Sequence, residues 1–139
     1  MALAEVKEAN QVSVILNDVP GELAKACEAL AKADVNIEGL CQTTGGNMVM
    51  VRFIVDKIEE AQEALESERK TVLFQRVIAM RFDEDKPGVL ANVARAFGST
   101  GINIVDIYHA SSGRKGVATM YIAVPPEYFS RAMKLAKEL

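Results

Sequence analysis

The 139-residue sequence has no tryptophan, one histidine and two cysteines, so chemistries that depend on these residues have little to draw on. Cys27 and Cys41 are too few for a disulfide scaffold, and their spacing matches no zinc pattern. His109 has no metal ligand or nucleophile at a useful spacing, and the acidic run 83–85 reads as a solvated turn rather than a calcium loop. We therefore expect no metal, no cofactor and no catalytic activity.

Long apolar runs are also missing, since none approaches the roughly 20 residues that cross a bilayer. The N-terminus is acidic within five residues, unlike a targeting segment. A net charge of −3 gives no electrostatic footprint for nucleic acid or an anionic membrane. Half of the residues are hydrophobic, which predicts a folded protein. Together these features predict a cytoplasmic protein that binds neither nucleic acid nor membrane.

What the sequence does contain is a duplication. The segment DVPGELA at residues 18–24 recurs 67 positions later as DKPGVLA at residues 85–91, and Asn36-Ile37 recurs as Asn103-Ile104 at the same offset. Further along, the best offset is 69, which places a two-residue insertion in the loop that contains Arg114-Lys115. The two copies are therefore expected to share one fold.

Both copies show the same order of patterns, β-α-β-β-α. Alternating and β-branched runs predict strands in the first copy over residues 11–16, 35–43, 49–55 and 71–74. The second copy predicts strands over residues 77–82, 102–110 and 117–124. In each copy one helix opens at the Pro-Gly turn, and a second follows the third strand.

This order predicts an α+β fold of two ferredoxin-like βαββαβ units in tandem, with antiparallel sheets and helices on one face. We expect the first unit over residues 1–75 and the second over residues 76–139. The second copy lacks a fourth strand, and we hypothesise that residues 2–8 supply it, within the chain or across a dimer. The alternative is a frayed N-terminus.

The repeated Pro-Gly turn has two physical interpretations. In the first, proline and glycine shape the turn, and the aspartate or the residue after it caps the helix. In the second, the unpaired N–H groups and positive dipole of the helix N-terminus form a site for a carboxylate or phosphate. Composition and spacing leave both open.

The pattern D-x-P-G-x-L-A, an apolar helix and then an Asn-Ile pair resembles the ACT domain, and it occurs twice over nearly the whole chain. The resemblance implies regulatory βαββαβ modules that bind amino acids or other small effectors, usually where two such domains meet. It also implies that turn backbone holds the effector's carboxylate, while the acidic residue and the asparagine take its amino group. The candidate ligand-binding residues are Asp18, Val19, Pro20, Gly21, Leu23, Asn36, Ile37, Asp85, Lys86, Pro87, Gly88, Leu90, Asn103 and Ile104.

The copies differ in charge. Residues 1–70 carry 7 basic and 13 acidic side chains, whereas residues 71–139 carry 9 basic and 6 acidic side chains. Because the two halves have net charges of opposite sign, contact between a first copy and a second copy is favoured. Val19 is replaced by Lys86 beside the second turn, so we expect stronger anion binding there, with a solvated lysine as the alternative. Arg114-Lys115 is interpreted as a solvated loop, with anion or partner contact as the alternative.

The expected function is to sense a small effector, an amino acid by the resemblance, and to modulate a partner enzyme or a regulator of amino-acid metabolism. A homodimer is the expected assembly. The alternative function is a ligand-free assembly adaptor, or a regulatory subunit of an amino-acid biosynthetic enzyme in which the tandem is only an interface.

Overall fold

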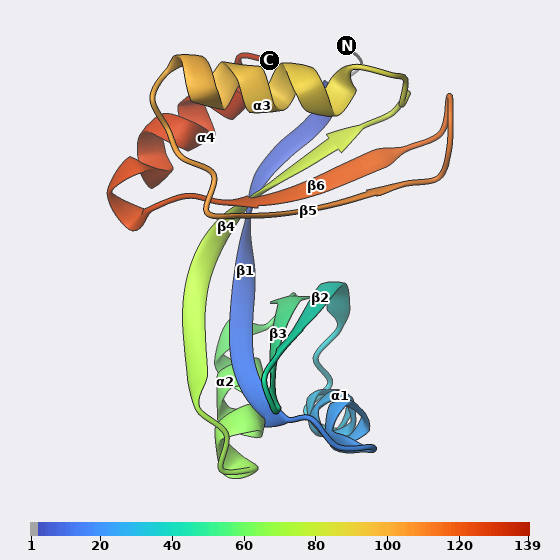
Figure 1. The fold of residues 1–139 in the computed structure, drawn as a ribbon, viewed down its shortest axis with the longest axis vertical. Helices are drawn as coiled ribbons and strands as arrows, with labels where there is room; N and C mark the ends of the chain where they lie inside the picture. Colours follow the sequence, from blue (N-terminus) through green and yellow to red (C-terminus); the bar gives the residue numbers. More distant parts are fainter. Residues whose placement is uncertain (1–2) are drawn as a thin grey trace. The chain divides into compact units, whose positions relative to one another are not determined.

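The computed structural model describes residues 3–139, over which strands and helices follow the duplicated order (Figure 1). The first copy contains β1 (Leu3–Asn17), α1 (Glu22–Lys32), β2 (Ile37–Gly45), β3 (Met48–Val55) and α2 (Ile58–Ser67). The second contains β4 (Val72–Phe82), α3 (Val89–Ser99), β5 (Asp106–Ser111), β6 (Ala118–Ala123), the 3₁₀ turn η1 (Pro126–Tyr128) and α4 (Phe129–Lys137). The predicted α+β fold of two ferredoxin-like units is confirmed.

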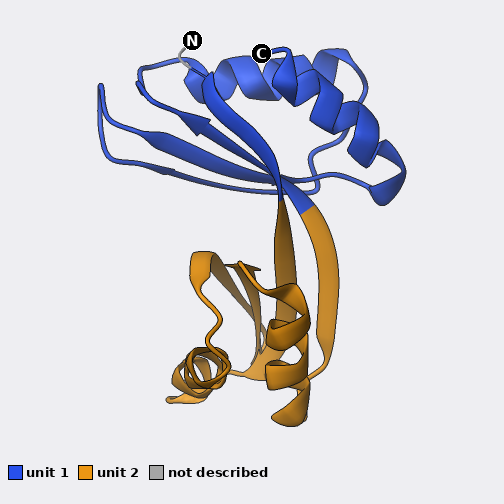
Figure 2. Ribbon diagram, turned by 180° about the vertical axis from the view of Figure 1, so that it is seen from behind, with its two compact units in different colours: residues 1–8, 77–139 blue, residues 9–76 orange. Residues whose placement is uncertain are grey.

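The chain divides into two compact units (Figure 2). Unit 1 comprises residues 1–8 and 77–139, and unit 2 comprises residues 9–76. Each unit therefore contains part of β1 and part of β4. Of the N-terminal segment 2–8, Ala2 lies outside the described residues, and residues 3–8 belong to unit 1.

Unit 2 has the strand order β2-β3-β1-β4. Residues of β1 and β3 pair in antiparallel register, for example Val12 with Phe53 and Val14 with Val51. These four side chains are fully buried together with Leu30 of α1 and the α2 residues Ala61 and Leu65. The helices thus lie on one face of the sheet, as alternation along the strands predicts.

Unit 1 repeats the arrangement with the order β5-β6-β4-β1. Met80 of β4 faces Met120 of β6, and both side chains are buried under α3 and α4. Leu3 and Val6 of β1 pack against the same cluster. The N-terminal part of β1 thus occupies the sheet position that residues 72–76 of β4 occupy in unit 2.

Several boundaries differ from the sequence-based expectation. The strand predicted at 11–16 begins at Leu3 and ends at Asn17, so it also includes residues 3–8. The strands predicted at 71–74 and 77–82 form one strand, β4, because no proline or glycine interrupts this stretch. The predicted strand 102–110 begins only at Asp106, and the strand 35–43 only at Ile37. In both cases the preceding residues close the helix.

These helix ends are Schellman motifs. After α3, Gly101 adopts φ 73°, its N–H donates to Gly98 O at 3.1 Å, and the Ile102 N–H donates to Phe97 O at 3.0 Å. After α1, Asp34 takes the left-handed position with φ 58° and the Val35 N–H donates to Leu30 O at 3.0 Å. The residues that we expected to open the strands serve as helix caps.

Candidate functional site

The repeated Pro-Gly turns place a glycine at the N-cap of each first helix. Gly21 has φ 91° and Gly88 has φ 101°, a left-handed conformation that favours glycine. Neither α1 nor α3 has a side-chain hydrogen bond at its N-cap, so the interpretation that an aspartate or its neighbour caps the helix is wrong. The first N–H of each helix donates within the turn, from Glu22 to Val19 O at 3.4 Å and from Val89 to Lys86 O at 3.3 Å. The next N–H groups of a helix have no intrahelical partner, so each turn still presents donors.

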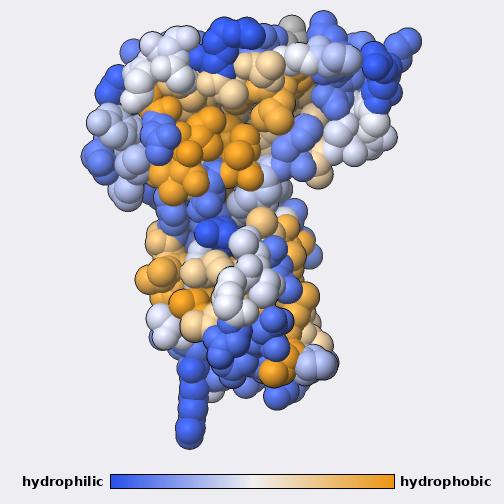
Figure 3. All heavy atoms as spheres, viewed as in Figure 1, coloured by the Kyte–Doolittle hydropathy of each residue, from blue (hydrophilic) through white to orange (hydrophobic). Residues whose placement is uncertain are grey.

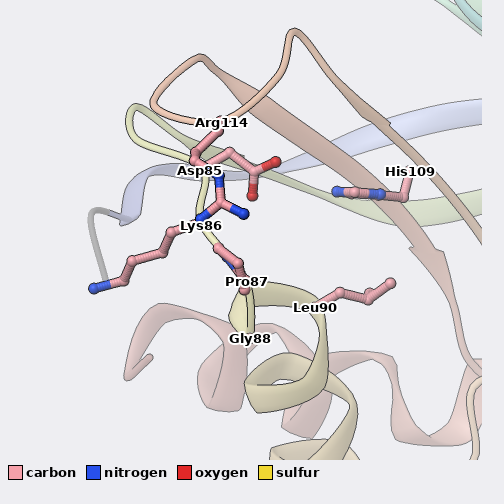
Figure 4. Close-up of a pocket in the computed structure, with 7 residues that line it drawn as sticks. All are labelled: Asp85, Lys86, Pro87, Gly88, Leu90, His109 and Arg114. Atoms are coloured by element: carbon pink, nitrogen blue, oxygen red, sulfur yellow. The ribbon is translucent and has the colours of Figure 1, made fainter.

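In unit 1 these donors face a pocket of about 290 Å³ (Figure 4). The pocket is lined by Asp85, Lys86, Pro87, Gly88, Leu90, His109 and Arg114. The first five are candidate residues from the sequence. The other two come from β5 and from the loop between β5 and β6. The sequence assigns His109 to no site and gives anion contact only as the alternative for Arg114.

The sequence carried a signal for both additional residues. His109 lies 67 positions after Gln42, and Gln42 lines the corresponding pocket of unit 2. Arg114 lies in the two-residue insertion that distinguishes the second copy from the first. Adding the 67-residue offset to Gln42, which lines the unit 2 pocket, gives His109 as a lining residue of the unit 1 pocket.

Asp85 fastens the inserted loop to the turn. Its N–H donates to Gly116 O at 2.7 Å, its carbonyl oxygen accepts from the Lys115 N–H at 2.8 Å, and its Oδ2 accepts from the Ser111 hydroxyl. Figure 4 shows the Arg114 guanidinium directed toward the Pro87–Gly88 turn, while the Lys86 side chain extends away from it. Of the two cations that line the pocket, Arg114 is therefore the one directed toward the turn that opens α3.

The turn of unit 2 is built differently. Its pocket measures about 90 Å³ and is lined by Leu16, Asn17, Asp18, Val19, Gly21, Glu22, Leu23, Gln42 and Val49. Glu22, the first residue of α1, is buried, and its counterpart in unit 1 is the apolar Val89. The smaller pocket thus has a carboxylate of its own at the helix N-terminus.

Nearby donors hold the Glu22 carboxylate in place. Lys70 donates to Oε1 at 3.3 Å, the Asn17 N–H donates to the same oxygen at 3.4 Å, and Lys25 lies 3.9 Å from Oε2. The hydrogen bond from Lys70 lowers the pKa of Glu22 from its ordinary value, against an opposing effect of burial. The carboxylate is therefore ionised at neutral pH, where it repels a second anion.

The Asn-Ile pairs lie away from these pockets. The Asn36 N–H donates to Asp56 Oδ1 at 2.9 Å, and Asn103 is exposed. Ile37 and Ile104 pack against the cores of their own units. None of the four is among the residues that line the two turn pockets, nor is Pro20.

Other site chemistries find little support among residues 3–139. This range holds no group of three or more histidine, cysteine, aspartate or glutamate residues placed to bind a metal. Cys27 and Cys41 are unbridged and half-buried, and burial raises the pKa of the Cys27 thiol. In the same range, no helix combines the length and the hydropathy required to span a membrane.

The fold and the site place this protein in a class of tandem ferredoxin-like proteins in which a Pro-Gly turn opens the first helix of each unit. A model of the ACT domain family matches residues 10–72 and 84–127, which is more than half of the chain. The chain belongs to the ACT domain family.

Solved structures share this tandem fold. A protein from Bacteroides thetaiotaomicron is 25% identical with a TM-score of 0.83, over 97% of this chain and 90% of that one. The aspartate kinase regulatory subunits from Thermus thermophilus and Thermus flavus are each 24% identical, with TM-scores of 0.73 and 0.72, over 99% of this chain and 98% of theirs. Curated protein sequences give no match.

Proposed function

We propose that this protein is a non-catalytic regulator that binds a small amino-acid effector in the unit 1 pocket. Occupancy of the pocket then modulates the activity of a partner enzyme. The observation that carries the proposal is the pocket at the N-terminus of α3. Five candidate residues of the family pattern line it, and Arg114 adds a cation beside the uncapped helix. Such a combination suits the carboxylate of an amino acid.

The first test is a thermal-shift screen of the full chain against the twenty amino acids, several 2-oxo acids and nucleotides. A ligand at about a hundredfold over its Kd stabilises the native state by roughly 2.7 kcal/mol, which raises Tm by several degrees. We expect a stereospecific response to one amino acid or a small group of them. A flat screen would contradict effector binding and favour the assembly-adaptor function.

A pair of substitutions tests whether the ligand-induced thermal shift arises from binding in the unit 1 pocket. Leu90 lines the pocket and is 40% exposed, so Leu90→Glu places a negative charge in the site with little effect on the core. Leu40 is 41% exposed and lines neither turn pocket, so Leu40→Glu is the matched control. We expect Leu90→Glu to abolish the ligand-induced shift and Leu40→Glu to retain it.

We also propose that the protein is a homodimer joined through β5. In the described residues β5 is at the end of the strand order, and exposed apolar side chains lie on or beside it at Leu90, Val105 and Ile107. Figure 3 shows hydrophobic side chains gathered on a face of unit 1. An open edge with apolar side chains favours pairing with a second copy.

The mass of the protein in solution tests this assembly. Sedimentation equilibrium should give twice the chain mass for the parent and the chain mass for Ile107→Glu. Val117 is exposed to a similar degree outside β5, and Val117→Glu is expected to remain dimeric. A monomeric parent protein would refute the dimer.

The partner enzyme is to be found by experiment, because the similarity to aspartate kinase regulatory subunits is one of fold. Tagged full-length protein, with and without the ligand from the screen, would be used to capture partners from an extract of its source. A partner whose activity changes with ligand supports the regulatory function. A partner held without any effect of ligand favours a structural subunit.

A further inference from the structure

We infer that the unit 1 pocket binds an acidic amino acid, a ligand with two carboxylates and one ammonium, and that Arg114 is its principal anion-binding residue. This inference rests on the proposed function and adds to it the chemical class of the effector. It comes from the charges that line the pocket, which differ from those of the equivalent pocket in unit 2.

The charged and polar groups of the unit 1 pocket lie at separate points of its lining. Arg114 contributes a positive charge directed toward the Pro87–Gly88 turn, Asp85 contributes a negative charge, and His109 adds an imidazole that can donate a hydrogen bond. The Lys86 side chain extends away from the turn, so it is not counted among the groups that contact a ligand. Arg114, Asp85 and His109 thus offer one partner for each of the three polar groups of an acidic amino acid, whereas a neutral or basic amino acid leaves His109 without an anionic partner.

The groups also match one another individually. The Arg114 guanidinium and the first turn of α3 converge on the space above Pro87–Gly88, where a first carboxylate gains the bidentate donors of arginine (Figure 4). Among residues 3–139 the side chains of Arg114 and Lys86 form no ion pair, so neither charge is already compensated. His109 offers a donor for the second carboxylate.

Asp85 supplies the place for the ammonium. Its Oδ2 accepts from the Ser111 hydroxyl, while Oδ1 makes no hydrogen bond in the described part of the chain. An ionised carboxylate can accept several hydrogen bonds, so Oδ1 remains available for a charged donor. Asp85 therefore has two functions, since it also fastens the loop that carries Arg114.

Hydrogen bonds within the loop order the backbone that carries Arg114. Val117 N–H donates to the Ser112 hydroxyl at 2.8 Å, Gly113 N–H donates to the Ser111 hydroxyl at 3.0 Å, and Gly116 N–H donates to Gly113 O at 2.8 Å. A site whose donors are already ordered loses less entropy on binding. The insertion thus adds both a cation and a rigid support.

Unit 2 provides the internal contrast. Its pocket is lined by the carboxylates of Asp18 and Glu22 and by no lysine or arginine. Its volume is less than a third of that of the unit 1 pocket. The acidic ligand is therefore assigned to unit 1 alone.

Isothermal titration of the full chain tests the ligand class. L-Aspartate and L-glutamate are compared with succinate and 2-oxoglutarate, which lack the ammonium, and with L-alanine, L-leucine and L-lysine. We expect at least one acidic amino acid to bind at least tenfold more tightly than any neutral or basic one. If a neutral or basic amino acid binds as tightly, the acidic class is refuted while effector binding stands. If none of these compounds binds while the thermal-shift screen finds another amino acid, the acidic class is refuted and effector binding stands. If the screen is flat as well, the proposed function itself fails.

Two substitutions test the assigned groups. Arg114→Gln should weaken the acidic ligand by about ten- to a hundredfold, because it removes a charged hydrogen-bonding partner. Lys115→Gly removes the same charge from the next residue, suits the positive φ there and leaves the pocket lining intact, so affinity should be unchanged. Equal losses for both variants, or none for Arg114→Gln, would overturn the role of Arg114.

Asp85→Asn distinguishes the amino acid from a plain dicarboxylate. It keeps an oxygen that accepts from Ser111 and removes the charge that faces the ammonium. We expect at least a tenfold loss of affinity for the acidic amino acid and no loss for succinate or 2-oxoglutarate. Equal losses for all of them would mean that Asp85 only positions the loop, and the ammonium assignment would be wrong.

Discussion

At the scale of single residues, the two copies differ most at the first position of their first helix. Glu22 is a buried carboxylate held by Lys70, whereas Val89 contributes to the apolar core of unit 1. One substitution thus separates a turn that contains its own anion from the turn at which we propose that an anion binds. The surrounding glycines and backbone geometry are the same in both.

The ionisation of Glu22 makes stability depend on pH. The Lys70 hydrogen bond lowers the native-state pKa, so the stabilisation is present above the unfolded pKa of about 4.3 and is lost as pH falls through the lower native value. Urea unfolding at pH 7, 4 and 3 should show that the parent loses more stability than Glu22→Gln over this range. Parallel curves would contradict a lowered pKa.

The left-handed glycines give a second prediction. A Cβ at Gly88 meets nothing within 4 Å, so Gly88→Ala carries only the backbone cost of φ 101°, about 1–2 kcal/mol. Gly98 lies inside α3 with equally open space and no left-handed φ, so Gly98→Ala should instead stabilise by about 0.5–1 kcal/mol. Thermal unfolding should therefore shift Tm in opposite directions. Shifts of the same sign would show that conformation is not the cause.

At the scale of elements, shared strands determine how each unit is completed. The N-terminal part of β1 belongs to unit 1, where Leu3 and Val6 pack on the core, and residues 72–76 of β4 belong to unit 2. Each unit thus has four strands although the chain has six in residues 3–139. The element that completes unit 1 comes from the opposite end of the sequence.

Removal of that packing should destabilise unit 1. Leu3→Ser with Val6→Ser removes two partly buried apolar side chains, and we expect a loss of about 2–4 kcal/mol in urea unfolding. Ala4→Ser with Lys7→Ser alters exposed positions of the same strand and should change stability by less than about 0.5 kcal/mol. Deletion of residues 1–8 should resemble the first variant. A deletion protein that unfolds like the parent would refute the contribution of this segment.

At the scale of the whole molecule, the duplication produced two units of similar fold and unequal surfaces. The unit 1 pocket is larger and is lined by Arg114 and His109, whereas the unit 2 pocket is smaller and is lined by the carboxylates of Asp18 and Glu22. Residues 71–139 also carry the excess of basic side chains. The two copies are thus suited to different tasks.

This asymmetry predicts one ligand per chain rather than two. Isothermal titration with the ligand identified in the screen should give a stoichiometry of about one, because Glu22 repels an anion at the other turn. Glu22→Val, which copies the unit 1 residue, leaves Lys70 without its partner and is the variant in which a second site could open. Two sites in the parent would contradict this asymmetry.

The sequence predicted the fold and both turns because these depend on local patterns. Alternation placed the strands, and the Pro-Gly pairs located the turns that open α1 and α3, although the N-cap residues are Gly21 and Gly88 rather than the expected aspartate or its neighbour. It could not show that Arg114 reaches the second turn, since that depends on the hydrogen bonds between Asp85 and the loop. Nor could it show that Glu22 is held by Lys70, 48 positions away.

The shared strands also bear on biosynthesis. Unit 1 is assembled from residues 1–8 and 77–139, so its first strand segment emerges from the ribosome before all of unit 2. Domains generally fold as units during synthesis, so unit 2 can fold once residue 76 has emerged. Residues 3–8 can pack into unit 1 only after residues 77–139 have been synthesised. Because β1 and β4 each contribute residues to both units, unit 1 cannot be produced as one uninterrupted segment of the chain.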